Sequence, residues 1–317
     1  MAKSLLSLVT VLFVISATGC RPTSESAAGA SQNKKESLAK ARKGFQTNLV
    51  RKESAKEPLP EPPASVFRIV SYQSPAGKMA AYLSVHSKDG KKRPAIIWIT
   101  GGDCNTIGDV WSPHQAKNDQ TASAYRKAGI VMMFPSLRGG NRNPGVREGF
   151  LGEVDDVLAA RDWLAKQEEV DPSRIYLGGH STGGTLALLV SECTDQFRGI
   201  FCFGPVHDPS QYDDEYVPFN AKDSREVMLR APMFWLHSIK SPTYMIEGKK
   251  DGNGLSLLAM ASTAKQDNLQ NIYSLMAANH DHFSVLAPAN KLIAAKILAD
   301  TGAAGINLTE EEINKAK

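Results

Sequence analysis

The run Gly179-His180-Ser181-Thr182-Gly183 has the residue types and spacing that a nucleophilic serine needs. It matches G-x-S-x-G and stands between a short apolar strand, residues 175–177, and an apolar helix start, residues 185–189. Flanking glycines let a chain turn sharply from strand to helix, which pushes the serine hydroxyl out of the sheet. The turn also directs the Thr182 backbone N–H, at a helix N-terminus, toward negative charge on a substrate. An ordinary glycine-rich turn is the alternative interpretation.

A serine hydroxyl is a poor nucleophile until a base accepts its proton, and that base is oriented by an acid. In enzymes built around this turn the chain order is serine, acid, histidine. The acid is therefore expected after the strand at 242–246, where Asp251 is our first choice and Glu247 the second. The base is expected after the last strand, where His280 and His282 both stand.

The neighbouring His180 is expected to point to the opposite face of its strand from the serine, and we assign it a structural role. An oxyanion hole needs a second donor beside Thr182. The loop after the strand at 94–100 reads Thr-Gly-Gly-Asp, and glycines allow close approach of backbone to substrate. Gly102 is our choice for this donor, with Gly101 and Asp103 as alternatives; a plain turn that ends the strand is the simpler interpretation.

Strands and helices alternate along most of the chain, which predicts a mostly parallel central sheet with helices on both faces. In such sheets, sites form at the carboxyl ends of the strands, where all the candidates above fall. Strands are predicted at residues 66–72, 79–85, 94–100, 130–135, 175–177, 199–205, 242–248 and 271–277. Helices are predicted at residues 121–128, 153–166, from the serine turn to 193, 255–265 and 291–299.

Composition, charge and cysteine spacing limit the classes of protein to which the chain can belong. The 317 residues are 42% hydrophobic and 22% charged, an ordinary globular balance. The net charge is +4, but much of the basic excess lies in the first 60 residues, so we expect no nucleic-acid partner. The cysteines show no C-x-x-C pair, so we expect no metal, and nothing implies an organic cofactor. A Cys193–Cys202 bridge is one interpretation; buried free thiols are the simpler one.

The N-terminus predicts export. Residues 1–19 combine Lys3, an apolar run and small residues before Cys20, which resembles a bacterial lipoprotein signal with Cys20 as the lipid attachment site. A simple cleaved signal peptide is the alternative. Arg21, in place of Asp, favours the outer over the inner membrane of a two-membrane envelope. Residues 20–63, rich in polar residues and proline, are predicted to be a flexible tether, and 64–317 one catalytic domain.

Several motifs together resemble the prolyl oligopeptidase-type serine hydrolases of the α/β-hydrolase superfamily. They are the serine turn, the run Pro-Ser-Leu-Arg-Gly-Gly-Asn at 135–141, the helix start Gly-Glu-Val-Asp-Asp at 152–156, and Asp-His-Phe at 281–283. They span about residues 94–299. The resemblance implies an α/β-hydrolase fold with Ser181 as nucleophile, Asp251 as acid and His282, directly before Phe283, as base.

The sequence departs from that family in two ways. The family often takes its second oxyanion donor from a tyrosine side chain or sets it beside His-Gly-Gly, whereas this chain has Thr-Gly-Gly, and there is no room for an N-terminal β-propeller. Strict proline specificity is therefore not expected, and a peptide or an acyl ester is the predicted substrate. Residues 207–241 are expected to form a cap over the site. The alternative function is a non-catalytic, envelope-anchored binding protein on the same fold; a nucleotide-binding domain lacks its glycine patterns.

Overall fold

A computed structural model describes residues 35–87, 89–302 and 305–316, and Lys35–Lys317 form one compact unit. Its centre is an eight-stranded sheet in the order β1-β2-β4-β3-β5-β6-β7-β8. The β1–β2 and β2–β4 pairs are antiparallel and all the others are parallel. The predicted mostly parallel α/β sheet is confirmed.

The strands follow the predicted positions within a few residues, apart from the early start of β5. They are β1 (Phe67–Ser74), β2 (Gly77–Ser84), β3 (Arg93–Ile99), β4 (Val131–Pro135), β5 (Val170–His180), β6 (Ile200–Phe203), β7 (Thr243–Gly248) and β8 (Ile272–Ala277). The helices are α1 (Leu38–Ala41), α2 (Ala124–Lys127), α3 (Gly152–Leu164), α4 (Thr182–Ser191), α5 (Ser224–Met228), α6 (Gly254–Gln266), α7 (Leu286–Ala299) and α8 (Glu310–Lys315).

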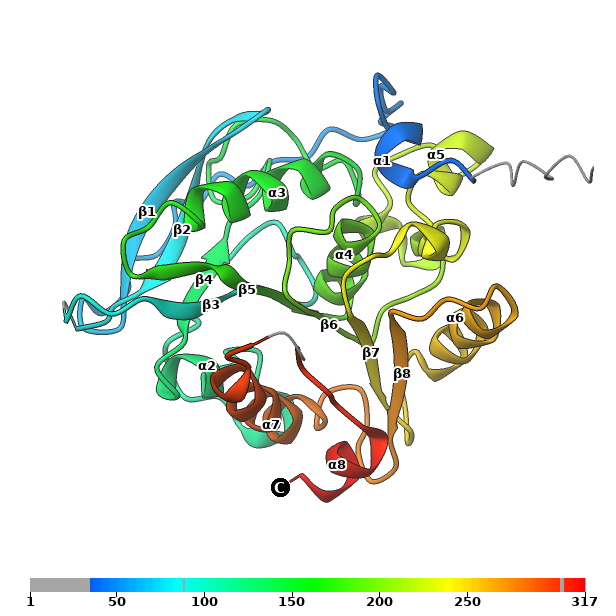
Figure 1. The fold of residues 1–317 in the computed structure, drawn as a ribbon. Coiled ribbons are helices and arrows are strands. Elements are labelled where there is room, and N and C mark those ends of the chain that lie inside the picture. The colour runs from blue at the N-terminus through cyan, green and yellow to red at the C-terminus, as the bar shows by residue number, and fades with distance from the viewer. Residues whose placement is uncertain (1–34, 88, 303–304, 317) are drawn as a thin grey trace, which may run out of the picture. The chain divides into compact units, whose positions relative to one another are not determined.

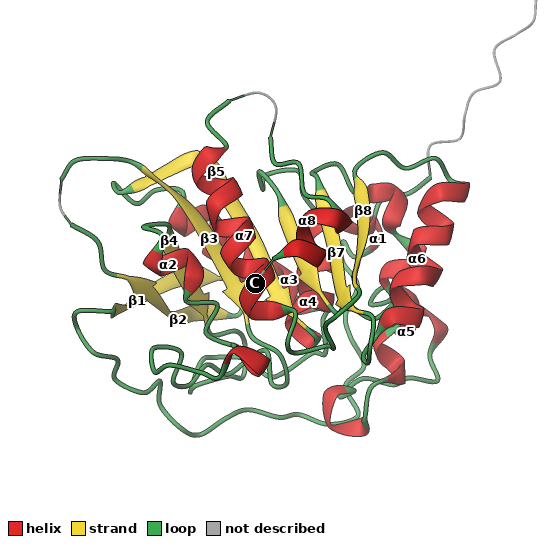
Figure 2. Cartoon of the chain, turned by 90° about the horizontal axis from the view of Figure 1, so that it is seen from below, coloured by secondary structure: helices red, strands yellow, loops and turns green. Residues whose placement is uncertain are grey.

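Helices cover both faces of the sheet (Figure 1). On one face lie α3, α4 and α6, and on the other lie α2, α7 and α8, which stand in front of the strands in Figure 2. Each face has its own hydrophobic cluster. Strand β3 shows why: Ile97 and Ile99 belong to one cluster, while Ile96 and Trp98 belong to the other. Successive side chains of a strand point to opposite faces, so a strand covered on both sides must be apolar throughout.

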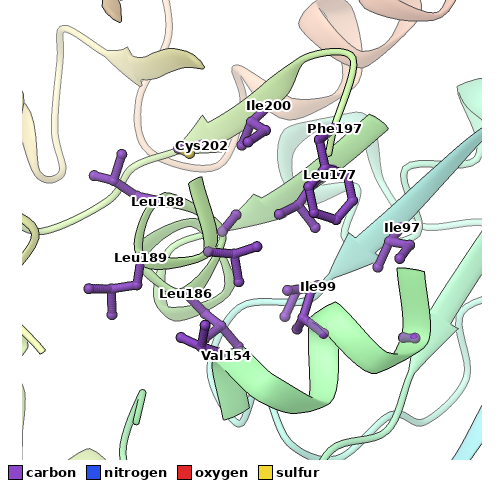
Figure 3. Close-up of a cluster of buried hydrophobic side chains, with 14 of the residues drawn as sticks. Ile97, Ile99, Val154, Leu177, Leu186, Leu188, Leu189, Phe197, Ile200 and Cys202 are labelled. Atoms are coloured by element: carbon purple, nitrogen blue, oxygen red, sulfur yellow. The ribbon is translucent and has the colours of Figure 1, made fainter. Parts of the chain in front are cut away.

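The helix that follows the serine is buried along its whole length. All ten residues of α4 are buried, and Leu186 lies near Val154 of α3 and Ile99 of β3 in the core (Figure 3). The three cysteines other than Cys20 are free thiols: Cys104 and Cys202 are buried, as the simpler interpretation had them, and Cys193 is partly buried.

The flexible tether predicted for residues 20–63 is wrong for residues 35–63, which lie against the body. Leu38 is fully buried in the core and Ala41 nearly so. Arg42 donates to both carboxylate oxygens of Asp155 on α3. A polar, proline-rich composition hides these few anchoring residues, because it averages over them. The predicted signal segment, Cys20 and the rest of the tether lie outside the described residues.

The N-terminal segment, residues 35–63, is hydrogen-bonded to the predicted cap. Residues 207–241 connect β6 to β7 and carry α5 with several short 3₁₀ turns. The Val50 amide donates to the Pro218 carbonyl at 2.8 Å, and Leu49 pairs with Phe219. The Thr47 hydroxyl donates to Glu226 of α5, beside α1 in Figure 1.

Among the described residues, no helix is long and apolar enough to cross a membrane.

Glu226 also forms a fully buried ion pair with Arg230, and the Arg230 guanidinium stacks on the Phe219 ring. Two charges taken out of water depend on each other, and removing one leaves the other uncompensated. The negative charges of Glu148 and Glu153 also attract Arg230, so the Arg230 charge stays partly compensated when Glu226 is replaced.

We predict that Glu226→Gln lowers the free energy of unfolding by roughly 3 kcal/mol, the low end for breaking a buried pair. Urea titration followed by circular dichroism measures it. The matched control is Glu311→Gln, which breaks the exposed Glu311–Lys315 pair and should leave the unfolding midpoint unchanged. Equal midpoints for both variants would contradict the stabilising role of Glu226 in the buried pair.

Candidate active site

Ser181 occupies a strained turn at the end of β5. Its φ of 54° and ψ of −114° are rare for a residue with a side chain. The strain is maintained by the surrounding hydrogen bonds, because the Ser181 amide donates to the Phe203 carbonyl of β6 at 2.8 Å. The Ser181 carbonyl in turn accepts from the Thr185 amide at 2.8 Å, which starts α4. The predicted strand–turn–helix around the serine is present.

The glycines of the motif let the helix approach the sheet. A Cβ on Gly183 would lie 2.4 Å from the Ile99 carbonyl oxygen, and one on Gly179 would lie 2.4 Å from the Gly183 carbonyl oxygen. Any side chain at either position would push α4 off the sheet and displace Ser181.

His282 follows β8 and is hydrogen-bonded to Glu247. The distance from His282 Nδ1 to Glu247 Oε2 is 2.9 Å, and the glutamate side chain is fully buried. Two backbone amides also donate to this carboxylate, Gly248 at 2.7 Å and Asn253 at 2.9 Å. These hydrogen bonds fix the direction of the Glu247 carboxylate, which can then orient the imidazole of His282.

The structure thus pairs His282 with Glu247, the second choice of acid, and not with Asp251, the first choice. Asp251 is exposed, and its carboxylate accepts from the amide of Gly252 next to it. The prediction placed the acid in the loop after β7, whereas Glu247 lies within the strand itself. A charged residue inside an otherwise apolar strand was the signal that favoured it.

The backbone below His282 leaves room for the ring. A Cβ on Gly204, directly after β6, would lie 2.3 Å from His282 Cε1. The imidazole therefore packs on bare backbone next to the strand end that binds the Ser181 amide. Among the hydrogen bonds of residues 35–316 that the structure describes, none joins the Ser181 hydroxyl to His282; catalytic hydrogen bonds of this kind often form only when substrate is bound.

His180 supports His282 from beneath, in keeping with its predicted structural role. The two rings lie 4.4 Å apart, and His180 Nε2 donates to the His282 carbonyl at 3.0 Å. The Gln120 side-chain amide donates to His180 Nδ1 at 2.9 Å. Burial and the neighbouring His282 lower the pKa of His180 to about 3, so this imidazole stays neutral at physiological pH.

Thr182 and the loop after β3 meet beside the serine. The Thr182 hydroxyl donates to the Gly102 carbonyl at 2.8 Å, and Gly102 has a positive φ of 71°. The Gly101 amide already donates to Gln120 Oε1 at 3.3 Å. Of the two predicted glycine donors, the amide of Gly102 is therefore the better candidate.

Two motifs outside the serine turn brace this loop. Arg138 forms a two-pronged ion pair with the fully buried Asp156 of α3, with distances of 2.9 and 3.0 Å. The Arg138 carbonyl accepts from the Asn105 side chain, which also donates to Glu153. The Arg-Gly-Gly run and the start of α3 thus hold the loop that carries Gly102.

A pocket of about 340 Å³ opens beside this loop. Its apolar part includes Phe150, Tyr216 and Pro218, from the start of α3 and the cap. Its charged part is Glu53 from the N-terminal segment, Asp103, Arg147 and Glu215. Arg147 donates to Asp103 at 2.5 Å. The contribution of Glu53 was not foreseen, because residues 20–63 were predicted to be a tether.

This fold and this site define an α/β-hydrolase. The chain belongs to the prolyl oligopeptidase family, whose model matches residues 117–299, more than half of the chain. The matched region includes Ser181, Glu247 and His282.

Individual proteins resemble parts of the chain. Prolyl oligopeptidase A of Amanita bisporigera is 29% identical over 111 residues, which is 33% of this chain and 13% of that protein. The Pyrococcus horikoshii acylaminoacyl peptidase shares the fold with a TM-score of 0.61 and 16% identity, over 79% of this chain and 44% of that one. A Pyrobaculum calidifontis esterase shares it with a TM-score of 0.53 and 18% identity, over 78% and 88%. The chain thus spans only a small part of the curated prolyl oligopeptidase it matches.

We predict that Glu247→Gln lowers kcat/KM by about 10³- to 10⁴-fold, because an amide in place of the orienting carboxylate favours the wrong imidazole tautomer. Steady-state hydrolysis of p-nitrophenyl butyrate measures it. The control is Asp251→Asn, which should keep kcat/KM within about twofold, as exposed substitutions away from the reacting groups do. A large loss in Asp251→Asn with an active Glu247→Gln would return the acid role to Asp251.

Proposed function

We propose that Ser181, His282 and Glu247 form a catalytic triad that hydrolyses its substrate through an acyl-enzyme. The observation that carries this proposal is the buried Glu247–His282 pair beside a serine held in a strained strand-to-helix turn. Stability alone does not explain why this carboxylate is buried with two amide donors and one imidazole, since a buried polar network costs more to build than an apolar core.

Each group has a distinct part in the reaction. Glu247 binds His282 Nδ1, which leaves Nε2 to accept the proton of Ser181 as its oxygen attacks the acyl carbon. The amides of Thr182 and Gly102 donate to the oxygen that becomes negative in the tetrahedral intermediate. The imidazolium then gives its proton to the leaving group as the bond to the acyl carbon breaks. Water next attacks the acyl carbon while His282 accepts its proton, and His282 returns that proton to the Ser181 oxygen as the acyl group leaves.

A peptide or acyl-amide bond is the proposed substrate, and an acyl ester is the second candidate. Membership of the prolyl oligopeptidase family supports the first. The fold shared with an esterase of similar length supports the second, since that chain is covered to 88%. Both reactions pass through the same acyl-enzyme, so the leaving group decides between them.

We predict that a fluorophosphonate probe labels the purified protein on Ser181. Labelling should vanish in Ser181→Ala, which has no nucleophile, and in His282→Ala, which has no base, and turnover should fall by several orders of magnitude. Intact-mass spectrometry with peptide mapping measures the label. Circular dichroism of both variants shows that the fold is kept. A wild-type protein that takes no label would instead favour the non-catalytic binding protein.

A panel of substrates separates the two bond types. Proline-anilide peptides, other aminoacyl anilides and p-nitrophenyl esters of increasing chain length share one chromophoric readout within each class. A higher kcat/KM for anilides than for esters of the same acyl group supports a peptidase, because amides are intrinsically harder to cleave.

We further propose that the protein is exported and held in the bacterial envelope by a lipid on Cys20. The support is the sequence around Cys20, with an apolar run before it and small residues directly preceding it. The body described here would then stand outside the cytoplasm, where a hydrolase meets external substrates.

We predict that the full chain, expressed in a two-membrane bacterium, incorporates an alkyne fatty acid and sediments with membranes. Cys20→Ser should abolish both, because the thiol is the acceptor of the lipid. In-gel fluorescence after click labelling measures incorporation, and Cys193→Ser is the matched control, which keeps Cys20. A soluble, unlabelled wild-type protein would favour the simple cleaved signal peptide.

A further inference from the structure

A path of three hydrogen bonds joins the loop after β3 to the loop that carries His282. It begins at Gly101, whose backbone amide donates to Gln120 Oε1 at 3.3 Å. The Gln120 side-chain nitrogen lies 2.9 Å from His180 Nδ1, and His180 Nε2 lies 3.0 Å from the His282 carbonyl oxygen. The path therefore connects segments that are far apart in the sequence, and it passes through the residue directly before the nucleophilic serine.

The direction of each hydrogen bond in this path is fixed by its end groups. A backbone amide can only donate, so Gln120 presents its oxygen to Gly101 and its nitrogen to His180. A backbone carbonyl can only accept, so His180 Nε2 carries the hydrogen of the ring. The bare Nδ1 of the neutral ring is then the acceptor that the Gln120 nitrogen requires. The second hydrogen of that nitrogen goes to Asn118 Oδ1, at 2.8 Å.

The His180 ring fills the space between the two loops. It is 1% exposed, and its centroid lies 4.4 Å from that of the His282 ring. A Cβ on Gly101 would lie 2.8 Å from His180 Nδ1 and 3.3 Å from Ser181 Cβ, so the loop after β3 packs directly on the ring and on the serine. Burial lowers the pKa of His180, so the ring is neutral at physiological pH and keeps the tautomer that the path requires.

We propose that Gln120 is a positioning residue that, through His180, sets the distance between the oxyanion hole and the base. This inference rests on the proposed function, in which Gly102 donates to the oxyanion and His282 accepts the proton. The Gln120 oxygen occupies the Gly101 amide, which leaves the next amide, that of Gly102, for the substrate oxygen. The other end of the path holds the backbone from which the His282 ring projects.

The two ends of the path act on the substrate in the same step. As the tetrahedral intermediate forms, the oxyanion hole receives the carbonyl oxygen while His282 receives the proton of Ser181. A shift of one end relative to the other weakens both contacts in the transition state, and a misplacement of about 1 Å can cost about 100-fold in rate. Acylation and deacylation both pass through such an intermediate, so the loss reaches kcat whichever step is slower. An interaction made only in the transition state changes kcat and leaves KM unchanged.

The test is steady-state hydrolysis of p-nitrophenyl butyrate by the full-length Gln120→Met variant. Methionine is close to glutamine in length but has no N–H group and no carbonyl oxygen for the path. We expect kcat to be about 10- to 100-fold lower and KM to stay within about twofold of wild type. A Gln120→Met enzyme with the kcat of wild type overturns the proposal, and so does a loss that appears mainly as a higher KM.

The matched control is Gln115→Met, the same change at an exposed glutamine that also lies between β3 and α2. The Gln115 side chain does not cap the turn that follows it. Both kcat and KM of this variant should stay within about twofold of wild type, as exposed substitutions away from the site do. A loss in Gln115→Met equal to that in Gln120→Met would overturn the proposal, because the effect would then belong to the segment and not to the path.

A double-mutant cycle with His180→Phe separates positioning from general damage. Phenylalanine occupies the place of the imidazole but breaks the path at both nitrogens. If Gln120 acts through His180, the double variant loses no more of kcat than His180→Phe alone, because the path is already broken. Losses that multiply overturn the proposal, since independent effects add in free energy. Should His180→Phe fail to fold, the separate effects of Gln120→Met on kcat and KM still decide.

Failure of the inference and failure of the proposed function give different results. Wild-type protein that neither hydrolyses the ester nor takes the fluorophosphonate label contradicts the proposed function and this inference with it. An active wild type with an unchanged Gln120→Met variant overturns the inference alone.

Discussion

The close packing of α4 on the centre of the sheet is the constraint on which the site depends. Gly183 brings the helix backbone so near to β3 that no side chain fits between them. That contact fixes the strained conformation of Ser181, sets the Thr182 amide beside it, and places the serine at the carboxyl end of β5. The neighbouring strand ends then supply the other groups in order: bare backbone from β6, Glu247 from β7 and His282 after β8. A parallel sheet makes this assembly automatic, since its carboxyl ends share one edge.

Two sets of buried charged side chains lie on either side of α4, and each is fixed by a different kind of partner. Glu247 is fixed by backbone amides and one imidazole, whereas Asp156 and Arg138 fix each other and, through Asn105, the loop with Gly102. The first arrangement orients the His282 ring, and the second holds backbone in place. Both are buried, so each depends on its full set of partners, because a buried polar group left unpaired is costly.

Much of this could be predicted from the sequence because the signals were local. Strand β3 and the serine turn are read from consecutive residues, and their apolar or glycine-rich patterns have few other solutions. The acid was harder: Glu247 and Asp251 stand four residues apart, and only the path of the chain after β7 decides which one faces His282. The N-terminal segment was missed for a related reason. Leu38 and Arg42 find their partners more than a hundred residues away, and no periodic pattern marks such contacts.

The docked N-terminal segment has a thermodynamic consequence. It contributes Glu53 to the pocket and shares hydrogen bonds with the cap, so the pocket has its full lining only while the segment is docked. Anything that fills the pocket must therefore also favour docking of the segment, and by reciprocity anything that pulls on or cuts the segment must weaken what the pocket holds. Docking of the N-terminal segment and occupancy of the pocket are in this way two sides of a single linked equilibrium.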